Sequence, residues 1–452
     1  MTTTGHDRTA SNAAATRREF LKTSAGTALT GGLLAGSLAS LGITRSVSAA
    51  AFAAGDDTIK VGLVGCGGRG TGAARQALLA DRNIKLIAMG DAFDDRLELS
   101  LKSLENSEIA SKLDVPAERR FVGFDAYKQV LDTGLDVVLL ATPPQFRPLH
   151  MKAAVDAGVH VFAEKPVAVD APGVRLALQV GEEAKKKNLS VVSGLALRYD
   201  GGMQDAVKRL HDGAVGDIRM LQANDWRTGR WVKPRQPDWT DMIYHMRNWY
   251  NFTWLSGDFN VEQHVHFLDL CSWVMGDKYP VVAYGLGGRQ VYSGAEYGNI
   301  YDHFSVVHEY EDGARLIANC RQMPGCFNDI SADVLGSKGI ARLSQRRNGK
   351  WIEAGGEKWV DEGNHKQGGQ VEHDVLMASI RDGKAVSNSD YQAKSTLLAI
   401  MGRMACYTGQ KITWEQALNS SEDLSPPAYD WNVPLPEAKY GAMAKPGVTR
   451  FS

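Results

Sequence analysis

Residues 60–91 read KVGLVGCGGRGTGAARQALLADRNIKLIAMGD, and this stretch decides the fold of the chain. A short apolar run typical of a β-strand comes first, at Val61–Val64. A glycine cluster and an alanine-rich helical segment follow, and a second apolar run, Ile84–Met89, leads to Asp91. Strand, glycine turn, helix and strand in this order predict a βαβ unit.

The glycine turn matches a nucleotide-binding pattern. Gly65, Gly67 and Gly70 fill G-x-G-x-x-G between a strand and a helix, where that motif must stand. The glycines allow a tight turn and let the backbone approach a pyrophosphate at the positive end of the helix. A glycine-rich turn that binds no ligand could have the same sequence. The strand before it, and the helix, second strand and acidic residue after it, favour dinucleotide binding, and we add Gly68 and Arg69 to the cofactor-binding residues.

Asp91 indicates which dinucleotide is bound. A carboxylate about 20 residues after the glycine turn, at the end of the second strand, holds the two ribose hydroxyls of NAD. Its charge repels a 2′-phosphate, so the sequence favours NAD. Arg96 stands close to Asp91 and keeps NADP open as an alternative.

Helices and strands continue to alternate, which predicts an α/β domain over residues 57–189 with a parallel, doubly wound sheet. Ligands of such sheets lie outside the carboxyl ends of the strands. We therefore assign four more residues at predicted strand ends to the cofactor crevice: Thr142, Pro143, Glu164 and Lys165.

The rest of the chain has a different pattern. Alternating apolar runs and glycine turns predict strands at 218–223, 281–286, 303–310 and 315–320, and helices at 371–380 and 391–407. We expect a second domain over residues 190–423. The tail, 424–452, is rich in proline, a composition that forbids helix and predicts an extended arm that lies on its own body or on a neighbouring subunit.

Several segments resemble the glucose–fructose oxidoreductase/inositol dehydrogenase (Gfo/Idh/MocA) family. They are Gly65–Gly70, Ala141–Pro144, Ala157–Val161, Glu164–Pro166, Arg198–Tyr199, Asn248–Tyr250, Gly257–Gly276 and Ser395–Leu397. The resemblance implies an N-terminal Rossmann domain and a C-terminal α+β domain with an open, mostly antiparallel sheet. That second domain would supply most of the substrate site and the subunit contacts of a homo-oligomer.

Lys165 and His266 are the candidates for proton transfer. Hydride transfer from a carbinol needs a base for the hydroxyl proton, and a partly desolvated lysine at the sheet edge can polarise the substrate oxygen. The alternative for Lys165 is a surface salt bridge with Glu164. His266 corresponds to the catalytic histidine of the family, and Glu262 stands where the family has an aspartate, so its role stays open.

Glu262, His266, Asp269 and Trp273 are spaced to form one polar face of a single helix. A substrate cleft would provide partners for such a face. His264 is either a ligand of a sugar hydroxyl or a packed core histidine. The spacing of the two histidines does not suit a helical metal site, so we predict no metal.

Five tryptophans lie between residues 226 and 254, interleaved with arginines. They are either a core under a long loop or the wall of a sugar site, and we favour the wall because flat rings stack on sugar faces. The predicted substrate residues are Arg198, Arg247, Trp249 and Tyr250, together with His264 and Asp269.

The N-terminus has the pattern of an export signal. Arg17 and Arg18 stand in TRREFLK, a broken apolar stretch follows, and small residues allow cleavage between Ala49 and Ala53. This predicts a twin-arginine signal peptide over residues 1–53, a periplasmic or otherwise exported protein, and no membrane anchor in the mature form. The periplasm holds no NAD pool, so the cofactor must be bound tightly and regenerated within the catalytic cycle.

Composition supports a small-molecule partner. The 452 residues are 44% hydrophobic and carry a formal net charge of −1 without blocks of like charge, which argues against nucleic acid. The five cysteines show no metal-binding spacing. We expect them to be mostly buried and reduced, with Cys320 and Cys326 as the one plausible bridge.

Three functions fit these observations. The first is an exported oxidoreductase that acts on the CH–OH group of a sugar, polyol or glycoside with a retained nicotinamide cofactor. The second is a glycosidase or lyase that oxidises its sugar transiently. The third, a sugar-binding protein without activity, is disfavoured because Lys165 and His266 are both present.

Overall fold

The computed structural model describes residues 57–346 and 348–452. The predicted signal peptide therefore lies outside the described residues. Within the described part of the chain, no helix is both long and apolar enough to cross a membrane.

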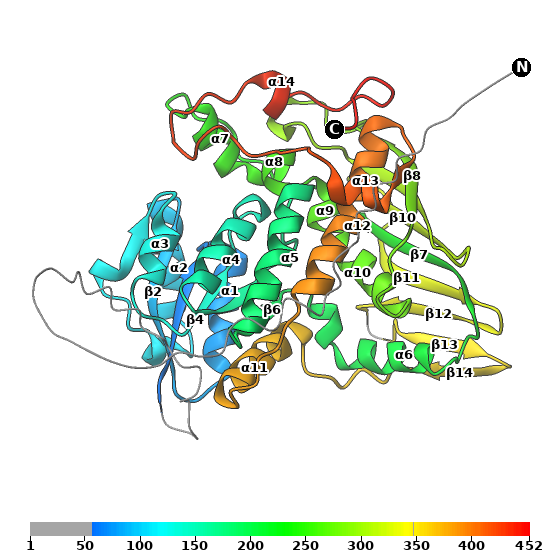
Figure 1. The fold of residues 1–452 in the computed structure, drawn as a ribbon, viewed down its shortest axis with the longest axis horizontal. Coiled ribbons are helices and arrows are strands. Elements are labelled where there is room, and N and C mark those ends of the chain that lie inside the picture. Colours follow the sequence, from blue (N-terminus) through cyan, green and yellow to red (C-terminus); the bar gives the residue numbers. More distant parts are fainter. Residues whose placement is uncertain (1–56, 347) are drawn as a thin grey trace, which may run out of the picture. The chain divides into compact units, whose positions relative to one another are not determined.

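The first domain is built on a six-stranded parallel sheet in the order β3-β2-β1-β4-β5-β6, drawn in blue and cyan in Figure 1. Its elements are β1 (Ile59–Val64), α1 (Gly68–Leu79), β2 (Ile84–Asp91), α2 (Asp94–Glu105), β3 (Arg120–Val122), α3 (Ala126–Leu131), β4 (Val137–Leu140), α4 (Arg147–Asp156), β5 (His160–Ala163), α5 (Ala171–Lys186) and β6 (Val191–Ser193). Every residue of β4 is buried, because helices cover both faces of the sheet. The strand order reverses between β1 and β4, which confirms the predicted Rossmann fold and opens a ligand crevice there.

The second domain contains a nine-stranded sheet in the order β14-β13-β12-β11-β7-β10-β9-β8-β15. Its strands are β7 (Ile218–Arg227), β8 (Val282–Gly288), β9 (His303–Glu309), β10 (Arg315–Gln322), β11 (Asp329–Gly336), β12 (Gly339–Ser344), β13 (Trp351–Ala354), β14 (Glu357–Val360) and β15 (Ile412–Thr413). The pair β7–β10 is parallel and the remaining pairs are antiparallel, so the expected open, mostly antiparallel sheet is confirmed.

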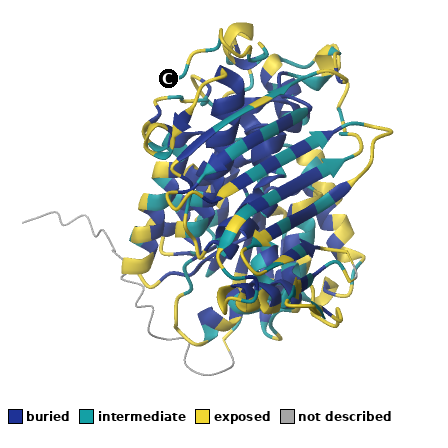
Figure 2. Ribbon diagram, turned by 90° about the vertical axis from the view of Figure 1, so that its right-hand side faces the viewer, coloured by how far each residue is buried: buried dark blue, intermediate teal, exposed yellow. Residues whose placement is uncertain are grey.

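Helices pack on one face of this second sheet. The helices that follow β6 in the chain are α6 (Gly201–His211), α7 (Asp241–Arg247), α8 (Thr253–Ser256), α9 (Phe259–Glu262), α10 (Val265–Val274), α11 (Gly368–Arg381), α12 (Ser389–Thr408), α13 (Trp414–Asn419) and α14 (Glu437–Tyr440). Burial alternates along β9 and β10, as expected for strands with one covered face, and Figure 2 shows this alternation of dark blue and teal. α10 and α12 provide the cover.

Helix α11 returns to the first domain, although it falls in the range predicted for the second. Its residues Leu376, Met377 and Ile380 belong to the same apolar core as β1 and β2. Just after it, the carbonyl of Val386 accepts a hydrogen bond from the amide of Val191 in β6. Packing therefore brings a late segment of the chain to the edge of the cofactor crevice.

The C-terminal arm lies on its own chain. Gln145 donates hydrogen bonds to the hydroxyl oxygens of Ser425 and Tyr429, and Tyr440 packs on Trp254. The proline-rich tail also holds the single helical turn α14, which begins directly after Pro436. A proline is compatible with that position because the first helical amides have no intrahelical acceptors. The expectation of a tail without helix is therefore wrong at this turn.

All five cysteines are free thiols. Cys66, Cys271, Cys320 and Cys406 are buried, as expected, and burial raises the pKa of each of these thiols. Cys326 is exposed, so the bridge between Cys320 and Cys326 that was considered plausible is not formed in this structure.

Candidate active site

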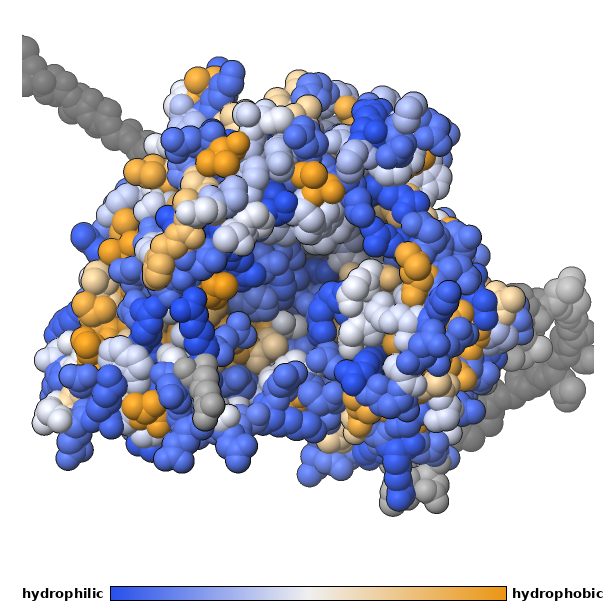
Figure 3. All heavy atoms as spheres, turned by 180° about the vertical axis from the view of Figure 1, so that it is seen from behind, coloured by the Kyte–Doolittle hydropathy of each residue, from blue (hydrophilic) through white to orange (hydrophobic). Residues whose placement is uncertain are grey.

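Two adjoining cavities lie at the carboxyl ends of the Rossmann strands. The first, which we call the glycine-loop cavity, has a volume of about 480 Å³ and is lined by Gly65, Gly67, Gly68, Asp91 and Thr142 among others. The second, the Lys165 cavity, has about 470 Å³ and is lined by Lys165, Glu262 and His266 among others. Both cavities share Arg69, Ala141, Thr142, Trp231 and Trp249. Figure 3 shows a face of the molecule that is hollowed, with a largely hydrophilic floor.

The glycine turn forms a cradle, and at two positions of this turn only glycine fits. Gly65 has φ +95°, and a Cβ there would lie 2.5 Å from the amide nitrogen of Thr142. A Cβ on Gly70 would lie 1.8 Å from the carbonyl oxygen of Gly65. At Gly67 and Gly68 a Cβ would meet nothing within 4 Å, so the backbone there is open. Helix α1 begins at Gly68, and the open backbone at its positive end fits a pyrophosphate.

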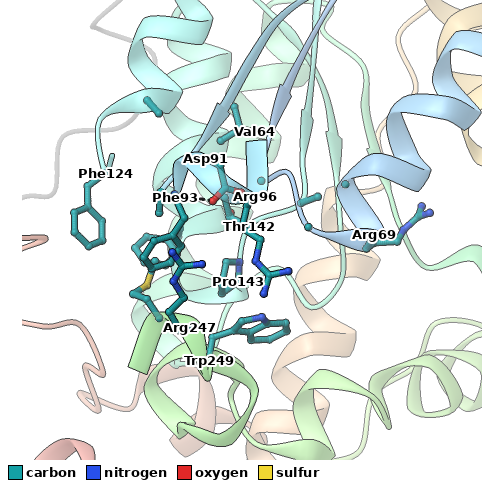
Figure 4. Close-up of a pocket in the computed structure, with 18 of the residues that line it drawn as sticks. Val64, Arg69, Asp91, Phe93, Arg96, Phe124, Thr142, Pro143, Arg247 and Trp249 are labelled. Carbon is teal, nitrogen blue, oxygen red and sulfur yellow. Dashed lines mark hydrogen bonds between the residues drawn. The ribbon is translucent and has the colours of Figure 1, made fainter. Parts of the chain in front are cut away.

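Asp91 ends β2 at the rim of this cradle (Figure 4). Its two oxygens accept hydrogen bonds from the amides of Cys66, at 2.6 Å, and Phe93, at 2.9 Å. Burial raises the pKa of the Asp91 carboxyl, and these amide bonds oppose the rise. Each carboxylate oxygen keeps a lone pair for a ribose hydroxyl, so the residue suits the predicted role while it also ties the glycine turn to the end of β2.

Replacing Asp91 with Ser is expected to lower the preference for NAD over NADP by at least about tenfold, or 1.4 kcal/mol. The charge that repels a 2′-phosphate is lost, and two such charges 4 Å apart near a surface repel by roughly 4 kcal/mol. Titration of each dinucleotide into variant and wild type measures the ratio. Absolute affinity for NAD should also fall, because the Cys66 amide loses its acceptor. An unchanged ratio would place the carboxylate outside the ribose pocket.

The Lys165 cavity brings together the three predicted proton-transfer residues. The Lys165 ammonium donates hydrogen bonds to the carbonyl oxygen of Glu262, at 2.6 Å, and to its carboxylate Oε1, at 3.0 Å. Only 11% of the Lys165 side chain and 9% of the Glu262 side chain are exposed. The partner of Lys165 is thus Glu262 rather than Glu164, the alternative considered from the sequence. Burial raises the pKa of the Glu262 carboxyl, and the Lys165 ammonium opposes that rise.

His266 stands in the first turn of α10 and lines the same cavity. Burial lowers the pKa of its imidazole well below the ordinary value, and the nearby cations Lys165, Arg227 and Arg69 lower it further. The ring is therefore neutral at pH 7 and able to accept a proton.

The predicted single helix through this region is wrong. α9 ends at Glu262 and α10 starts at Val265, with Gln263 and His264 between them. In this break the His264 amide donates to the carbonyl of Phe259, five residues earlier, so the turn is wider than that of an α-helix. Glu262 and His266 consequently face the cavity, whereas the other polar residues of the predicted face point elsewhere.

Three predicted substrate residues do not line either cavity, and we correct their assignment. Asp269 is fully buried and pairs with Arg198 at 2.8–3.1 Å, so each charge already has its partner. Ser395 also donates to Asp269. His264 is fully buried with its Nδ1 3.2 Å from Asn260 Oδ1, and burial lowers the pKa of its ring to about 3. His264 is thus the packed core histidine of the two alternatives.

The remaining predicted substrate residues divide between the cavities. Arg247 lines the glycine-loop cavity, where its guanidinium lies 3.8 Å from the ring centre of Phe93 and pairs with Asp95 (Figure 4). Arg247 therefore lines the glycine-loop cavity and not the Lys165 cavity. Trp249 lines both cavities, and Tyr250 lines the Lys165 cavity while its hydroxyl accepts a hydrogen bond from Gln322.

Arg69 points away from Asp91 and the other nucleotide-side residues (Figure 4). Its guanidinium forms ion pairs with Glu164 and, at 3.2 Å, with Glu372 of α11, and all three line the Lys165 cavity. Burial raises the pKa of Glu372 well above its ordinary value, and the neighbouring Glu164 raises it further. No sequence motif marks Glu372, since only the packing of α11 on the first domain brings it here.

Arg147 is a second residue that sequence reasoning missed. It is buried, lines the Lys165 cavity, and donates to the carbonyl oxygens of Thr142 and Pro166. These carbonyls follow β4 and β5, so Arg147 holds the two strand ends that carry Thr142 and Lys165. Burial lowers the pKa of its guanidinium to about 10. The sequence shows only an arginine shortly after Pro143 and Pro144, and its burial is visible only in the structure.

A Rossmann domain with an open glycine cradle beside a lysine–histidine cavity is typical of dinucleotide-dependent oxidoreductases. The chain matches the sequence models of the oxidoreductase family NAD-binding Rossmann fold over residues 59–195 and of that family's C-terminal alpha/beta domain over residues 207–399. It belongs to the Gfo/Idh/MocA oxidoreductase family, and its first domain is the NAD-binding domain of that family.

Individual relatives are distant. Inositol 2-dehydrogenase of Rhizobium meliloti (strain 1021) is 24% identical over 291 residues, which are 64% of this chain and 77% of the relative. The scyllo-inositol 2-dehydrogenase (NAD(+)) of Bacillus subtilis (strain 168) is 20% identical over 284 residues, 62% of this chain and 72% of the relative.

Solved structures share the fold. Aldose-aldose oxidoreductase from Caulobacter crescentus, complexed with glycerol, has a TM-score of 0.63 at 18% identity and covers 79% of this chain and 100% of its own. The scyllo-inositol dehydrogenase from Lactobacillus casei with bound cofactor NAD(H) and scyllo-inositol has a TM-score of 0.61 at 18% identity, over 79% of this chain and 100% of its own.

Proposed function

We propose that this chain oxidises a CH–OH group of a sugar or polyol by hydride transfer with a retained NAD. The observation that carries the proposal is the shared wall of the two cavities, which sets Lys165 and His266 directly beside the dinucleotide cradle. The names of the relatives, which are dehydrogenases of inositols, support a polyhydroxylated substrate.

The residues divide the chemistry between them. NAD supplies the hydride acceptor when it is bound. The neutral imidazole of His266 takes the hydroxyl proton as hydride leaves the carbon, and the Lys165 ammonium donates to the same oxygen. Glu262 holds that ammonium in place through its carboxylate and its carbonyl oxygen. Lys165 and His266 therefore act on one hydroxyl group.

The walls of the Lys165 cavity suit a sugar ring. Trp231, Trp249 and Tyr250 offer flat apolar surfaces to the C–H faces of the ring. Charged side chains of Arg69 and Glu164 offer donors and acceptors to its hydroxyls.

We further propose that the protein is exported as a folded holoenzyme by the twin-arginine route, and that it works as a homo-oligomer. The motif at Arg17 and Arg18 supports export. In a compartment without an NAD pool, one substrate must reduce the bound cofactor and a second substrate must reoxidise it. The cofactor then completes its cycle without leaving the protein.

The test is to follow the nicotinamide absorbance of purified protein carrying its native cofactor while aldoses, inositols and glycosides are added singly and in pairs. We expect one substrate to reduce the bound cofactor and a second to reoxidise it. If glycosides are cleaved while no net change in absorbance occurs with any sugar, transient oxidation followed by elimination or hydrolysis is the better account. A protein that is purified empty and turns over only with added NAD would contradict cofactor retention.

The pH dependence of cofactor reduction should have its acid limb well below pH 6.5. Burial and nearby cations lower the pKa of His266, and only the neutral ring accepts a proton, so the rate stays full above that lowered pKa and falls as the pH drops through it. Single-turnover rates across the acid range measure the limb, with folding checked at each pH. A limb centred at or above pH 6.5, or one that persists in His266→Asn, would assign it to another group.

A further inference from the structure

The C-terminal arm packs against the wall of the glycine-loop cavity. We call residues 424–441 the strap. The ring of Trp431 lies 4.3 Å from that of Phe124 and 5.2 Å from that of Phe93, measured between centres. The ring of Tyr429 lies 5.2 Å from that of Phe146. Phe93, Phe124 and Phe146 all line the cavity, so the strap supports its Rossmann-side wall from behind.

The same strap is fastened to the opposite wall. The hydroxyl of Thr240 donates to the carbonyl oxygen of Trp431. Thr240 also caps α7, the helix that carries Met246 and Arg247 of the cavity lining. In Figure 1 the red chain passes α7 and α8 on its way to α14. The strap is thus bonded to both sides of the crevice.

Further contacts close the strap on itself and on the first domain. Tyr440 donates to the carbonyl oxygen of Ser425 at 2.7 Å, and Gln145, next to the cavity residue Phe146, donates to Ser425 at 2.9 Å. Aromatic rings of the strap and of both walls form one apolar cluster that is separate from the other two apolar clusters of the described residues. The strap lies beyond residue 399, where the family match ends.

We propose that the strap is a cofactor-retention element, in which Trp431 ties the two walls of the glycine-loop cavity together and slows the release of the dinucleotide. A bound dinucleotide leaves only when the walls part, and parting them breaks the contacts of Trp431 with Phe93 and Phe124. This inference rests on the proposed function, which needs a cofactor that stays bound.

The test measures dinucleotide release in the absence of turnover. Holoprotein loaded with NADH is mixed with an excess of NAD, and the loss of bound NADH fluorescence gives the release rate. Trp431→Ala should release NADH about tenfold to a hundredfold faster than wild type, because several aromatic contacts are lost. Trp431→Phe, which keeps a ring, should lie between the two. The matched control is Trp359→Ala, which removes the same side chain from β14, far from the strap in the fold.

A second variant keeps the proposal testable if Trp431→Ala does not fold. Tyr429→Leu removes the ring that packs on Phe146 and should also accelerate release. Release at the wild-type rate in folded Trp431→Ala or Tyr429→Leu would overturn the strap while leaving the proposed function intact. Wild type that binds no dinucleotide at all would overturn both. Equal acceleration in Trp359→Ala would show a general loss of stability instead of retention and would also overturn the strap.

Discussion

Replacing His266 with Asn is expected to slow the reduction of bound cofactor by about 10²–10⁴-fold, the range lost with a general base. The imidazole is neutral at pH 7 because burial and neighbouring cations lower its pKa, so it is ready to accept the hydroxyl proton. Asparagine keeps a polar group of similar reach without the basic nitrogen. Single-turnover reduction of the retained cofactor by the best substrate measures the loss, and binding of cofactor and substrate should change little.

Lys165→Met should also slow the reaction, and the double variant should be far less than additive if both side chains act on one hydroxyl. The structure adds a complication, since Lys165→Met leaves the Glu262 carboxyl buried without its ammonium partner. Removing one member of a buried ion pair costs about 3–5 kcal/mol of stability. Lys165→Met combined with Glu262→Gln is therefore the control that separates chemistry from folding. If His266→Asn reacts at the wild-type rate while Lys165→Met is inactive, the lysine is the base.

Gly70→Ala is expected to weaken dinucleotide binding by at least about a hundredfold, or 2.7 kcal/mol. The added Cβ would lie 1.8 Å from the carbonyl oxygen of Gly65, which is backbone and has no side-chain freedom with which to move. The clash is relieved only by moving α1 away from β1, which takes the helix N-terminus away from the pyrophosphate. Calorimetric titration with NAD measures the loss, and thermal unfolding of the cofactor-free protein reports the structural cost separately.

Gly72→Ala, two residues further along α1, is the matched control. Its Cβ would lie 3.6 Å from Arg69 Nη1, an ordinary contact, so binding should stay within about threefold of wild type. Gly67→Ala probes the cradle itself, because the new methyl group meets no protein atom within 4 Å and interferes only with a ligand. Normal binding by Gly70→Ala would show that α1 does not need its close approach to β1.

The local patterns of the first domain were sufficient to predict its fold. The predicted strand runs Val61–Val64 and Ile84–Met89 lie within β1 and β2. Buried parallel strands are continuous apolar runs, and glycine turns have few alternatives, so both signals are contained in short stretches of sequence. The strands of the second sheet are also predictable from short stretches, because apolar and polar residues alternate along a strand that has one covered face.

The prediction of one polar helical face is wrong because two helices, α9 and α10, stand where the spacing predicts one. The spacing of Glu262, His266 and Asp269 suits an α-helix, but a break separates Glu262 at the end of α9 from the other two in α10, and Asp269 is fully buried. It meets Arg198, which is distant in sequence, and the two charges neutralise each other. A sequence pattern shows which residues share a helical face but does not show what packs against that face.

The sequence by itself determined the dinucleotide cradle, the assignment of strand-end residues to one crevice, and the choice of Lys165 and His266 as proton-transfer candidates. Each of these depends on a short motif whose geometry is local. Tertiary structure alone decided that Glu262 binds Lys165, that Arg69 meets Glu372, and that the strap reaches Phe93 and Phe124. All three contacts join segments far apart in the chain, and the second and third depend on α11 and on the C-terminal arm. Those two form because packing of α11 and of the C-terminal arm on the first domain buries apolar surface, and no local pattern encodes which charged and aromatic groups that burial brings together.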